Sequence, residues 1–410
     1  MGGSDRALVL GLIAFLVVAR GALAIPGRAL RDWAFALVNL AAIGAIAYAK
    51  PGPWLGFFAA YLAVVVVSWG AMRALARRRG RAPWLAFAIP LFALGLVKYA
   101  SPAWRPLFHA LGTPEPLQIP GLYFVGLSYM AFRLSYLVLE VRNGVVEPPG
   151  LGRYLGFAFF FPTVFVGPIS RFATHEQSLD RPSRRATPVV TSLLRLVVGL
   201  TKYLFLGNLA NQVAYASLQT DAVPHARVDW VIAAIAYYLY LYLNFSGFCD
   251  VAIGAAGLLG IRVDENFDQP FRSRNIQDYW NRWHITLSTY LRDVVFTPLS
   301  KVLVGRMGPK NRDHAVAIAV FVTFVLVGVW HGAGFNFVAF GLLHAIAVVA
   351  HHYYAAFLKK RLGKAGIRAY NENRWIRAVA VLSTHVYVTL ALGFFAAKGD
   401  GLLRLLHLVK

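Results

Sequence analysis

Long apolar stretches recur along the whole chain, and they constrain its fold more than any other feature. The chain is 58% hydrophobic and only 14% charged, whereas about 25% of the residues in a soluble domain are charged. The sequence excludes an ordinary soluble enzyme and a disordered chain. It predicts a single all-α, polytopic membrane domain over residues 1–410, with about 10–11 transmembrane helices plus re-entrant or interfacial helices. The expected full spans are residues 7–19, 33–49, 54–69, 84–99, 122–139, 188–206, 231–248, 315–330, 335–357 and 376–397.

Basic residues gather in the short loops between these stretches and set the expected orientation. The chain has 41 Lys and Arg against 18 Asp and Glu, a net charge of +23. In a soluble protein this charge would suggest nucleic acid binding, but basic loops of a membrane protein face the cytoplasm. We therefore expect the loops with Arg77 and Lys360 inside the cell, and residues 101–121 and 220–228 outside.

Residues 154–169 break the regular series of spans. Pro162, Gly167 and Pro168 interrupt helical hydrogen bonding, and a basic stretch that starts at Arg171 follows at once. Broken backbone at membrane depth is tolerated only where it is buried or lines a cavity. We expect a re-entrant segment here, and the alternative is an ordinary crossing with a kink.

Residues 271–312 are the least membrane-like part of the chain. They carry eight basic and two acidic residues, a net charge of +6. This composition predicts interfacial or re-entrant helices on the cytoplasmic side. The same charge suits the docking of an acidic partner, for which Arg306 and Lys310 are candidates.

His331 is the first candidate for chemistry, because it ends an apolar run and begins Trp-His-Gly-Ala-Gly. An ionisable residue at the end of a spanning helix is a functional candidate. A neutral imidazole can take a proton from a hydroxyl. Trp330 would form a wall of the site, and Gly332 and Gly334 allow close approach. The alternative is a structural histidine bonded to a neighbouring carbonyl.

His284 is the second candidate, in Trp-Asn-Arg-Trp-His-Ile-Thr-Leu-Ser. With Trp280 and Trp283 it forms an aromatic group at helical spacing. It would orient or contact a substrate, and Asn281 beside it could donate a hydrogen bond to a developing oxyanion, as could His284 itself. The alternative is an aromatic belt on an interfacial helix.

Other polar residues give weaker signals. His175 and Asp180 form a His-x4-Asp pattern that also occurs in glycerolipid acyltransferases, but so short a pattern arises often by chance. Asp250 lies in an apolar run rich in small residues, where it could contact a substrate or pair with a nearby arginine. The chain has one cysteine and no phosphate-binding loop. We expect no metal site, although three histidines lie on one late helix: His344, His351 and His352.

Four stretches taken together resemble the membrane-bound O-acyltransferase family, and in particular its bacterial branch that acylates cell-envelope polymers by D-alanylation or O-acetylation. They are Phe-Phe-Phe-Pro-Thr-Val-Phe-Val-Gly-Pro-Ile-Ser-Arg-Phe at 159–172, Asn-Phe-Ser-Gly-Phe-Cys-Asp at 244–250, Glu-Asn-Phe-Asp-Gln-Pro-Phe through Leu-Arg-Asp at 265–293, and Trp-His-Gly-Ala-Gly at 330–334. The first 100 residues match only in hydropathy.

The resemblance implies a helical ring around a thin centre and places the catalytic histidines on His331, as general base, and His284. The substrate-binding candidates are Trp330, Trp283, Asn281 and Asp250. No bound cofactor is expected. The implied acyl donor is a cytoplasmic thioester, on a phosphopantetheinyl carrier protein or coenzyme A. The implied acceptor is a hydroxyl of an extracytoplasmic polymer or lipid-linked glycan, and small membrane or secreted helpers are expected partners. The implied location is the bacterial cytoplasmic membrane.

Two other classes of protein stay open at this point. A transporter of envelope lipids or polysaccharides would need inverted repeats and paired broken helices, and no internal repeat is visible in the sequence. A non-catalytic scaffold would tolerate the loss of both histidines. The acyl group, D-alanyl or acetyl, and the acceptor are not determined by the sequence.

The orientation is testable by cysteine labelling in intact cells. Single cysteines at positions 77 and 360 should react only after the membrane is made permeable, because basic loops stay inside. Cysteines within residues 101–121 and 220–228 should react with an impermeant reagent from outside. Labelling of position 77 from outside would contradict the orientation.

Overall fold

The computed structural model describes residues 3–49, 54–110, 126–180, 188–214, 227–332 and 334–396. Within these residues the chain is helical, with one isolated antiparallel bridge between Phe267 and Trp283 and no strand. The contacts divide it into two compact units. Unit 1 comprises residues 1–204 and 245–265, and unit 2 comprises residues 205–244 and 266–410. The single domain expected over 1–410 stays a prediction.

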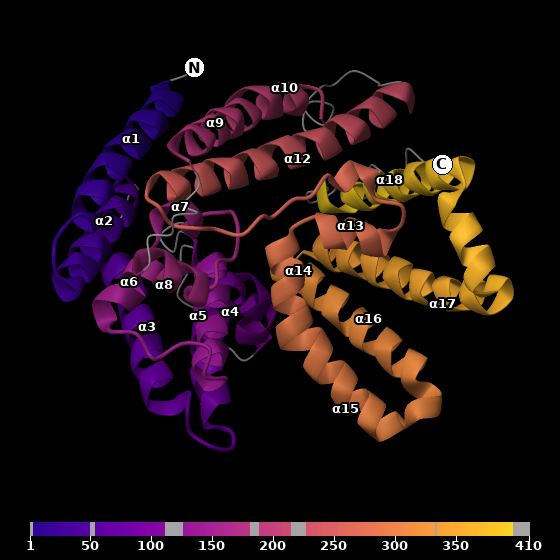
Figure 1. Cartoon of the computed structure of the whole chain (residues 1–410), viewed down its shortest axis with the longest axis horizontal. Coiled ribbons are helices and arrows are strands. Elements are labelled where there is room, and N and C mark those ends of the chain that lie inside the picture. Colours follow the sequence, from indigo (N-terminus) through magenta and orange to yellow (C-terminus); the bar gives the residue numbers. More distant parts are fainter. Residues whose placement is uncertain are drawn as a thin grey trace. The chain divides into compact units, whose positions relative to one another are not determined.

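Unit 1 is formed by helices from the first half of the chain (Figure 1, indigo to magenta). In it α1 packs on α2, α2 on α6, and α4 on both α3 and α5. The helices are α1 (Gly3–Leu23), α2 (Arg28–Tyr48), α3 (Trp54–Leu75), α4 (Ala82–Ala110), α5 (Leu127–Arg142), α6 (Leu151–Ala158), α7 (Phe161–Val164), α8 (Phe172–Asp180) and α9 (Val189–Leu200).

Unit 2 is built mainly from the C-terminal half (Figure 1, orange to yellow). There α16 packs along α17, and α17 packs on α18. The helices are α10 (Gly207–Gln212), η3 (Pro270–Arg272), α13 (Ile276–Arg282), α14 (Ile285–Leu291), η4 (Arg292–Phe296), α15 (Thr297–Met307), η5 (Pro309–Asn311), α16 (Arg312–His331), α17 (Phe335–Glu372) and α18 (Arg374–Ala396). The long helix α12 (Arg227–Leu258) and the π-helix η2 (Thr201–Leu206) each contribute residues to both units.

The polytopic all-α prediction is confirmed. Nine helices of the described chain are long and apolar enough to cross a membrane, and they coincide with nine of the ten expected spans. The tenth expected span, residues 122–139, is described only from residue 126 and stays a prediction. Its described part is α5, which has 16 residues and is buried over most of its length, so its apolar side chains pack against protein.

One loop boundary differs from the expectation. Helix α4 continues to Ala110, so the expected outer loop of 101–121 starts too early. The rest of that loop, residues 111–121, lies outside the described residues, as do residues 220–226 of the second outer loop and the basic residues Arg181, Arg184 and Arg185.

Small residues bring α9 and α12 into close contact, as expected from the small residues in the apolar run around Asp250. A Cβ atom built on Gly199 would lie 2.6 Å from the backbone nitrogen of Val251, and one on Gly254 would lie 2.8 Å from that of Leu196. No side chain fits between backbones at this separation. The glycines of the Asn-Phe-Ser-Gly-Phe-Cys-Asp region therefore have a packing role.

The predicted break in residues 154–169 is confirmed, while its depth in the membrane stays a prediction. Helix α6 ends at Ala158, α7 has four residues, and α8 begins at Phe172. Buried polar side chains complete the hydrogen bonds of this broken backbone. Arg133 on α5 donates to the carbonyls of Phe157 (3.0 Å) and Thr163 (2.6 Å).

Two more side chains, one on α2 and one on α5, accept hydrogen bonds from the same segment. The amide oxygen of Asn39 on α2 accepts from the backbone N–H of Phe161 at 2.8 Å. The carboxylate of Glu140 on α5 accepts from the N–H groups of Phe172 and Ala173, the first residues of α8. A carboxylate at a helix N-terminus satisfies free N–H groups and interacts favourably with the helix dipole.

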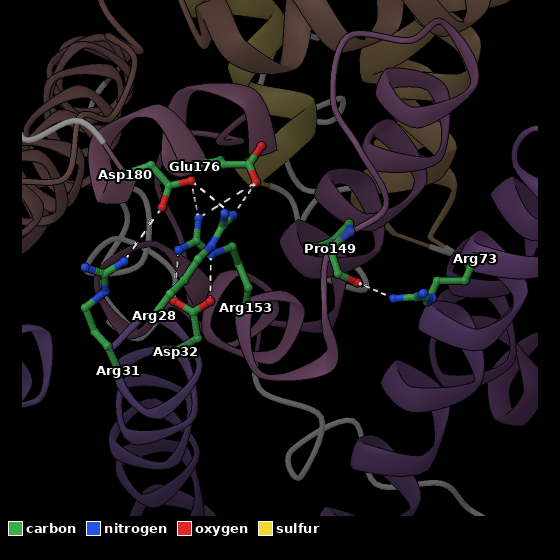
Figure 2. Close-up of polar contacts among 8 residues, drawn as sticks. All are labelled: Arg28, Arg31, Asp32, Arg73, Pro149, Arg153, Glu176 and Asp180. Carbon is green, nitrogen blue, oxygen red and sulfur yellow. Dashed lines mark hydrogen bonds and ion pairs between the residues drawn. The ribbon is translucent and has the colours of Figure 1, made fainter. Parts of the chain in front are cut away.

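An ion cluster around the buried Arg153 ties α2, α6 and α8 together (Figure 2). Arg153 has a side chain only 2% exposed, and it pairs with Asp32 at 2.9 Å and with Asp180 at 2.7 Å. Arg28 reaches Asp180 at 3.1 Å, and Glu176 lies 3.5 Å from Arg28. Arg31 also contacts Asp180, at 3.7 Å. Figure 2 also shows Arg73, which donates to the carbonyl of Pro149 at the start of this region.

His175 lies beside this cluster but outside its ion pairs. Its ring packs against Phe157 and Phe160, both at 5.3 Å between centroids. Burial, with a contribution from Arg133 and Arg153, lowers the pKa of His175 to about 3. Since arginines hold the carboxylate of Asp180, the acid of the His-x4-Asp pattern serves an ion cluster. This supports treating that pattern as a chance match.

The role of Arg133 is testable by substitution. Arg133→Met should destabilise the protein by about 2–3 kcal/mol, because two buried carbonyls lose a charged donor. Thermal unfolding of the purified protein in detergent measures the effect. Arg142→Met is the matched control on the same helix, where an exposed guanidinium stacks on Trp84 and contributes less than about 1 kcal/mol. Equal melting temperatures for the two variants would contradict this role.

Candidate functional site

His331 is positioned by the C-terminal end of α16, in unit 2. Its ring lies 4.6 Å from Trp330, 4.9 Å from Phe395 and 5.8 Å from Phe340, centroid to centroid. Gly332 follows in extended backbone, and a Cβ atom there would lie 2.3 Å from the ring of Phe337. The glycine after the histidine therefore lets an aromatic wall close around the imidazole.

His284 is positioned by a sharp turn between α13 and α14. Its φ of 47° makes it one of two non-glycine residues with positive φ in the described chain. Such backbone costs roughly 1 kcal/mol or more and often occurs at functional sites. A short antiparallel contact holds the turn. Ile285 donates to the carbonyl of Asn266 at 3.0 Å, and Asp268 donates to that of Arg282 at 3.0 Å.

Asn266 fixes the ring of His284, and the sequence interpretation did not single it out. The Asn266 side chain is buried. Its Oδ1 accepts from the backbone N–H of Thr286 at 3.2 Å and from the Thr286 hydroxyl at 2.9 Å, and it lies 3.1 Å from His284 Nδ1. The available signal was a polar residue next to an aromatic one, in Glu-Asn-Phe-Asp, 18 residues before the histidine.

These contacts determine the tautomer of His284. A backbone N–H can only donate, so the Asn266 atom that faces Thr286 is the oxygen. The same oxygen faces His284, so Nδ1 of the imidazole carries the proton and donates. In the neutral ring, Nε2 then accepts hydrogen bonds. The expected use of neutral His284 as an oxyanion donor does not fit this tautomer.

His331 lies close enough to His284 to affect its titration. Burial lowers the pKa of His284 to about 3, and the proximity of His331 contributes to the shift. The ring of His284 also lies 6.4 Å from that of Trp330, the residue before His331. His284 is therefore neutral at physiological pH, and Trp330, His331 and His284 form one local group.

Helix α13, which precedes His284, carries a cluster of aromatic side chains. Trp283 is buried, stacks on Tyr279 at 5.5 Å and meets Phe267 edge-on at 5.0 Å. Trp280 donates from Nε1 to His344 Nδ1 at 3.1 Å, which places this third histidine in the aromatic core. Asn281 is exposed on the other face of α13, so its predicted binding role gains no support from burial.

Asp250 belongs to unit 1, whereas His284, His331, Trp283 and Trp330 belong to unit 2. Its carboxylate accepts from Arg195 at 3.0 Å and from Lys202 at 2.7 Å. The ion-pair alternative for Asp250 is therefore observed, and its predicted contact with substrate stays a prediction. Among the residues that the structure describes, no group of three or more His, Cys, Asp or Glu side chains could hold a metal ion.

Comparison with known proteins gives a family match over most of the chain. Residues 54–393 match the membrane-bound O-acyltransferase family. The chain is 30% identical to a teichoic acid D-alanyltransferase of Bacillus subtilis, over 79% of this chain and 81% of that protein. It is 28% identical to a "probable alginate O-acetylase AlgI" of Pseudomonas aeruginosa and 30% identical to a peptidoglycan O-acetyltransferase of Helicobacter pylori, covering 73% and 72% of this chain and 56% of each relative.

The hydrogen bond from His284 to Asn266 can be tested by titration. Asn266→Asp should raise the pKa of His284 from about 3 towards its usual 6.5, because a carboxylate partner favours the imidazolium. A histidine with a depressed pKa in the folded state loses stability as pH falls below its unfolded pKa. The melting temperature of the wild type should thus fall between pH 6.5 and pH 4, and that of Asn266→Asp should fall less.

NMR of protein with labelled histidine rings gives the same answer directly, with His284→Gln as the assignment control. An unchanged titration of His284 in Asn266→Asp would show that the two side chains are not bonded.

Proposed function

This chain belongs to the membrane-bound O-acyltransferase family and is an O-acyltransferase, and on that premise we propose that it acylates a hydroxyl of a cell-envelope polymer or lipid-linked glycan. The donor in this proposal is a thioester on the cytoplasmic side, carried by a phosphopantetheinyl protein or by coenzyme A. The acceptor is on the outer side of the cytoplasmic membrane. Only the acyl end of the donor then needs to enter the protein, because the carrier is too large and too charged to cross.

The observation that carries the proposal is the convergence of His331 and His284 within one aromatic-walled group of unit 2. They are 47 residues apart in sequence, yet the proximity of His331 contributes to the lowered pKa of His284. A neutral imidazole in a largely buried site is suited to remove a proton from a hydroxyl at neutral pH. Aromatic walls exclude water, which would otherwise hydrolyse the thioester.

The reaction then follows from ordinary acyl-transfer chemistry. His331 accepts the proton of the incoming hydroxyl while its oxygen attacks the thioester carbonyl. The tetrahedral intermediate expels the thiolate, which leaves with the proton from the imidazolium, so the histidine returns to its neutral form. No ATP is consumed at this step, because the thioester is already activated.

His284 has a supporting role in this scheme. Its Nδ1–H is committed to Asn266, so Nε2 can accept a hydrogen bond from the acceptor hydroxyl and hold it near His331. Trp330 and Trp283 are proposed to wall the path of the acyl chain, and Asp250 and Asn281 remain proposed substrate contacts. An oxyanion donor must come from another N–H or O–H group.

D-alanine is the acyl group that we favour. The chain spans 81% of the Bacillus subtilis teichoic acid D-alanyltransferase and 56% of the alginate relative from Pseudomonas aeruginosa. The second candidate is acetyl, because the relatives also include a peptidoglycan O-acetyltransferase. Mass spectrometry of the envelope polymers of cells with and without the protein distinguishes the two groups.

The assignment of His331 is tested by His331→Ala. Loss of a general base should lower turnover by about 10²–10⁴-fold, while the melting temperature changes little, because the imidazole ends its helix and is only partly buried. Turnover and melting temperature should be measured on the same purified protein. His284→Ala should also be severely impaired.

His175→Ala is the matched control, because His175 is fully enclosed but lies outside the proposed site. It should lose stability through a cavity and keep its turnover per folded molecule. A His331→Ala protein that is folded and turns over near the wild-type rate would contradict the assignment. A non-catalytic scaffold would tolerate both His331→Ala and His284→Ala. A folded but inactive His175→Ala would instead support the hypothesis that the His-x4-Asp pattern is catalytic.

We propose that the exposed cations near the turn between α15 and α16 dock the donor. Arg306, Lys310 and Arg312 are all exposed there, and acyl-carrier proteins are acidic. Replacing Arg306 and Lys310 together by Gln should raise KM for the carrier-bound donor several-fold and flatten its dependence on salt, with kcat unchanged.

Arg78→Gln with Arg79→Gln removes the same charge from a loop in unit 1 and is the control. An unchanged KM in the variant that lacks Arg306 and Lys310 would contradict docking at this site. The charge would then only set the orientation of the protein in the membrane.

A further inference from the structure

A pocket of about 1110 Å³ lies between α17 and α18 in unit 2, and its lining shares no residue with the histidine group. Gly363 creates it. With a φ of 61°, this glycine ends the first part of α17, and residues 364–372 form a short helical arm in a new direction. The side chain of Asn373 then starts α18 by accepting from the backbone of Trp375 at 2.9 Å. The arm and α18 both contribute residues to its lining.

The charge of the pocket has one sign. Its lining includes four basic side chains and no carboxylate: Arg274, Lys359, Lys364 and Arg377. Two carboxylates lie nearby, and each has an arginine partner. Asp278 accepts from Arg282 at 2.8 Å, and Glu372 accepts from Arg368 at 2.8 Å. Asp278 also accepts from the backbone N–H of Arg274, a lining residue, at 3.1 Å. Within the described residues, none of the four lining cations has an ion-pair partner.

The rest of the lining is apolar and aromatic. Ile276, Leu358, Ile367 and Ile376 supply aliphatic surface. Tyr354 and Tyr370 join their hydroxyls at 3.1 Å, and Trp375 is 69% exposed. Tyrosine, tryptophan and basic residues at the end of a spanning helix are typical of the interface between membrane and water.

Exposed apolar side chains of α17 and α18 adjoin the pocket. Helices α17 and α18 are both long and apolar enough to cross a membrane. Their outward side chains next to the pocket are exposed and apolar, with Phe357 59%, Val379 65% and Leu382 67% exposed. A ligand in the pocket can therefore keep one end among the cations and lay another along the apolar helices.

We propose that this pocket binds the headgroup of an anionic phospholipid, with the start of its acyl chains against α18. The phosphate supplies a negative charge that pairs with the four cations. Basic pockets between transmembrane helices are suited to such headgroups. A soluble phosphate compound would leave the apolar wall exposed. The inference does not depend on the proposed acyl transfer.

The test is native mass spectrometry of the purified full-length protein in detergent, with phosphatidylglycerol or phosphatidylcholine added. The wild type should retain phosphatidylglycerol preferentially. Lys359→Gln with Lys364→Gln should weaken that binding by about 30-fold, the effect of two basic residues near an anionic group. Lys360→Gln with Arg361→Gln is the matched control, since both residues adjoin the pocket in sequence but do not line it.

Retention of phosphatidylglycerol by the control and its loss in the pocket variant support the proposal. Equal retention of phosphatidylglycerol by the pocket variant and the control would overturn it, because the pocket cations would then contribute no more than other surface charges. Equal binding of phosphatidylcholine by the wild type would also overturn it. Coenzyme A serves as a competitor, and displacement of phosphatidylglycerol by it at low micromolar concentration would assign the pocket to a soluble donor instead. If the pocket variant unfolds, Arg377→Gln, an exposed single substitution, replaces it in the same comparison.

Discussion

Where the backbone leaves a helix inside the protein, away from water, its N–H and C=O groups need partners from the protein itself. The broken segment between α6 and α8 meets this requirement through Arg133, Asn39 and Glu140. Each of these polar side chains is buried in an otherwise apolar helix, where it would be costly without a partner. Their positions on α2 and α5 therefore fix the path of the segment. The ion cluster around Arg153 joins α6 to α8, the helices on either side of it.

The same constraint shapes the histidine group in unit 2. Asn266 lies in the non-helical stretch between α12 and η3, and the turn at His284 has left-handed backbone. Asn266 pairs with this turn through its backbone and its side chain at once. The bonds that stabilise the non-helical segment thus also fix the ring of His284.

The sequence predicts the spans, the break at 154–169 and the two central histidines, because each depends on local composition or on motifs. It does not predict Arg133 or Asn266, whose partners lie 18 to 30 residues away and depend on tertiary packing. Hydropathy predicts a span over residues 122–139 but not the burial of α5 within the protein, because it does not distinguish burial in protein from burial in lipid. The pairing of Asp250 with Arg195 and Lys202 was only one alternative, since nothing local decides between a ligand and an ion pair.

An amide beside His284, where many enzymes place a carboxylate, has a physical consequence. An aspartate would fix the same tautomer, but it would bring a negative charge into a buried aromatic site and favour the imidazolium. Asn266 fixes the ring of His284 without adding a charge, and burial keeps that imidazole neutral. In the proposed reaction this leaves His331 as the group that becomes charged, and the neutral neighbour adds no second charge to repel it. Two histidines in one aromatic site can then have different roles because one is committed to an amide.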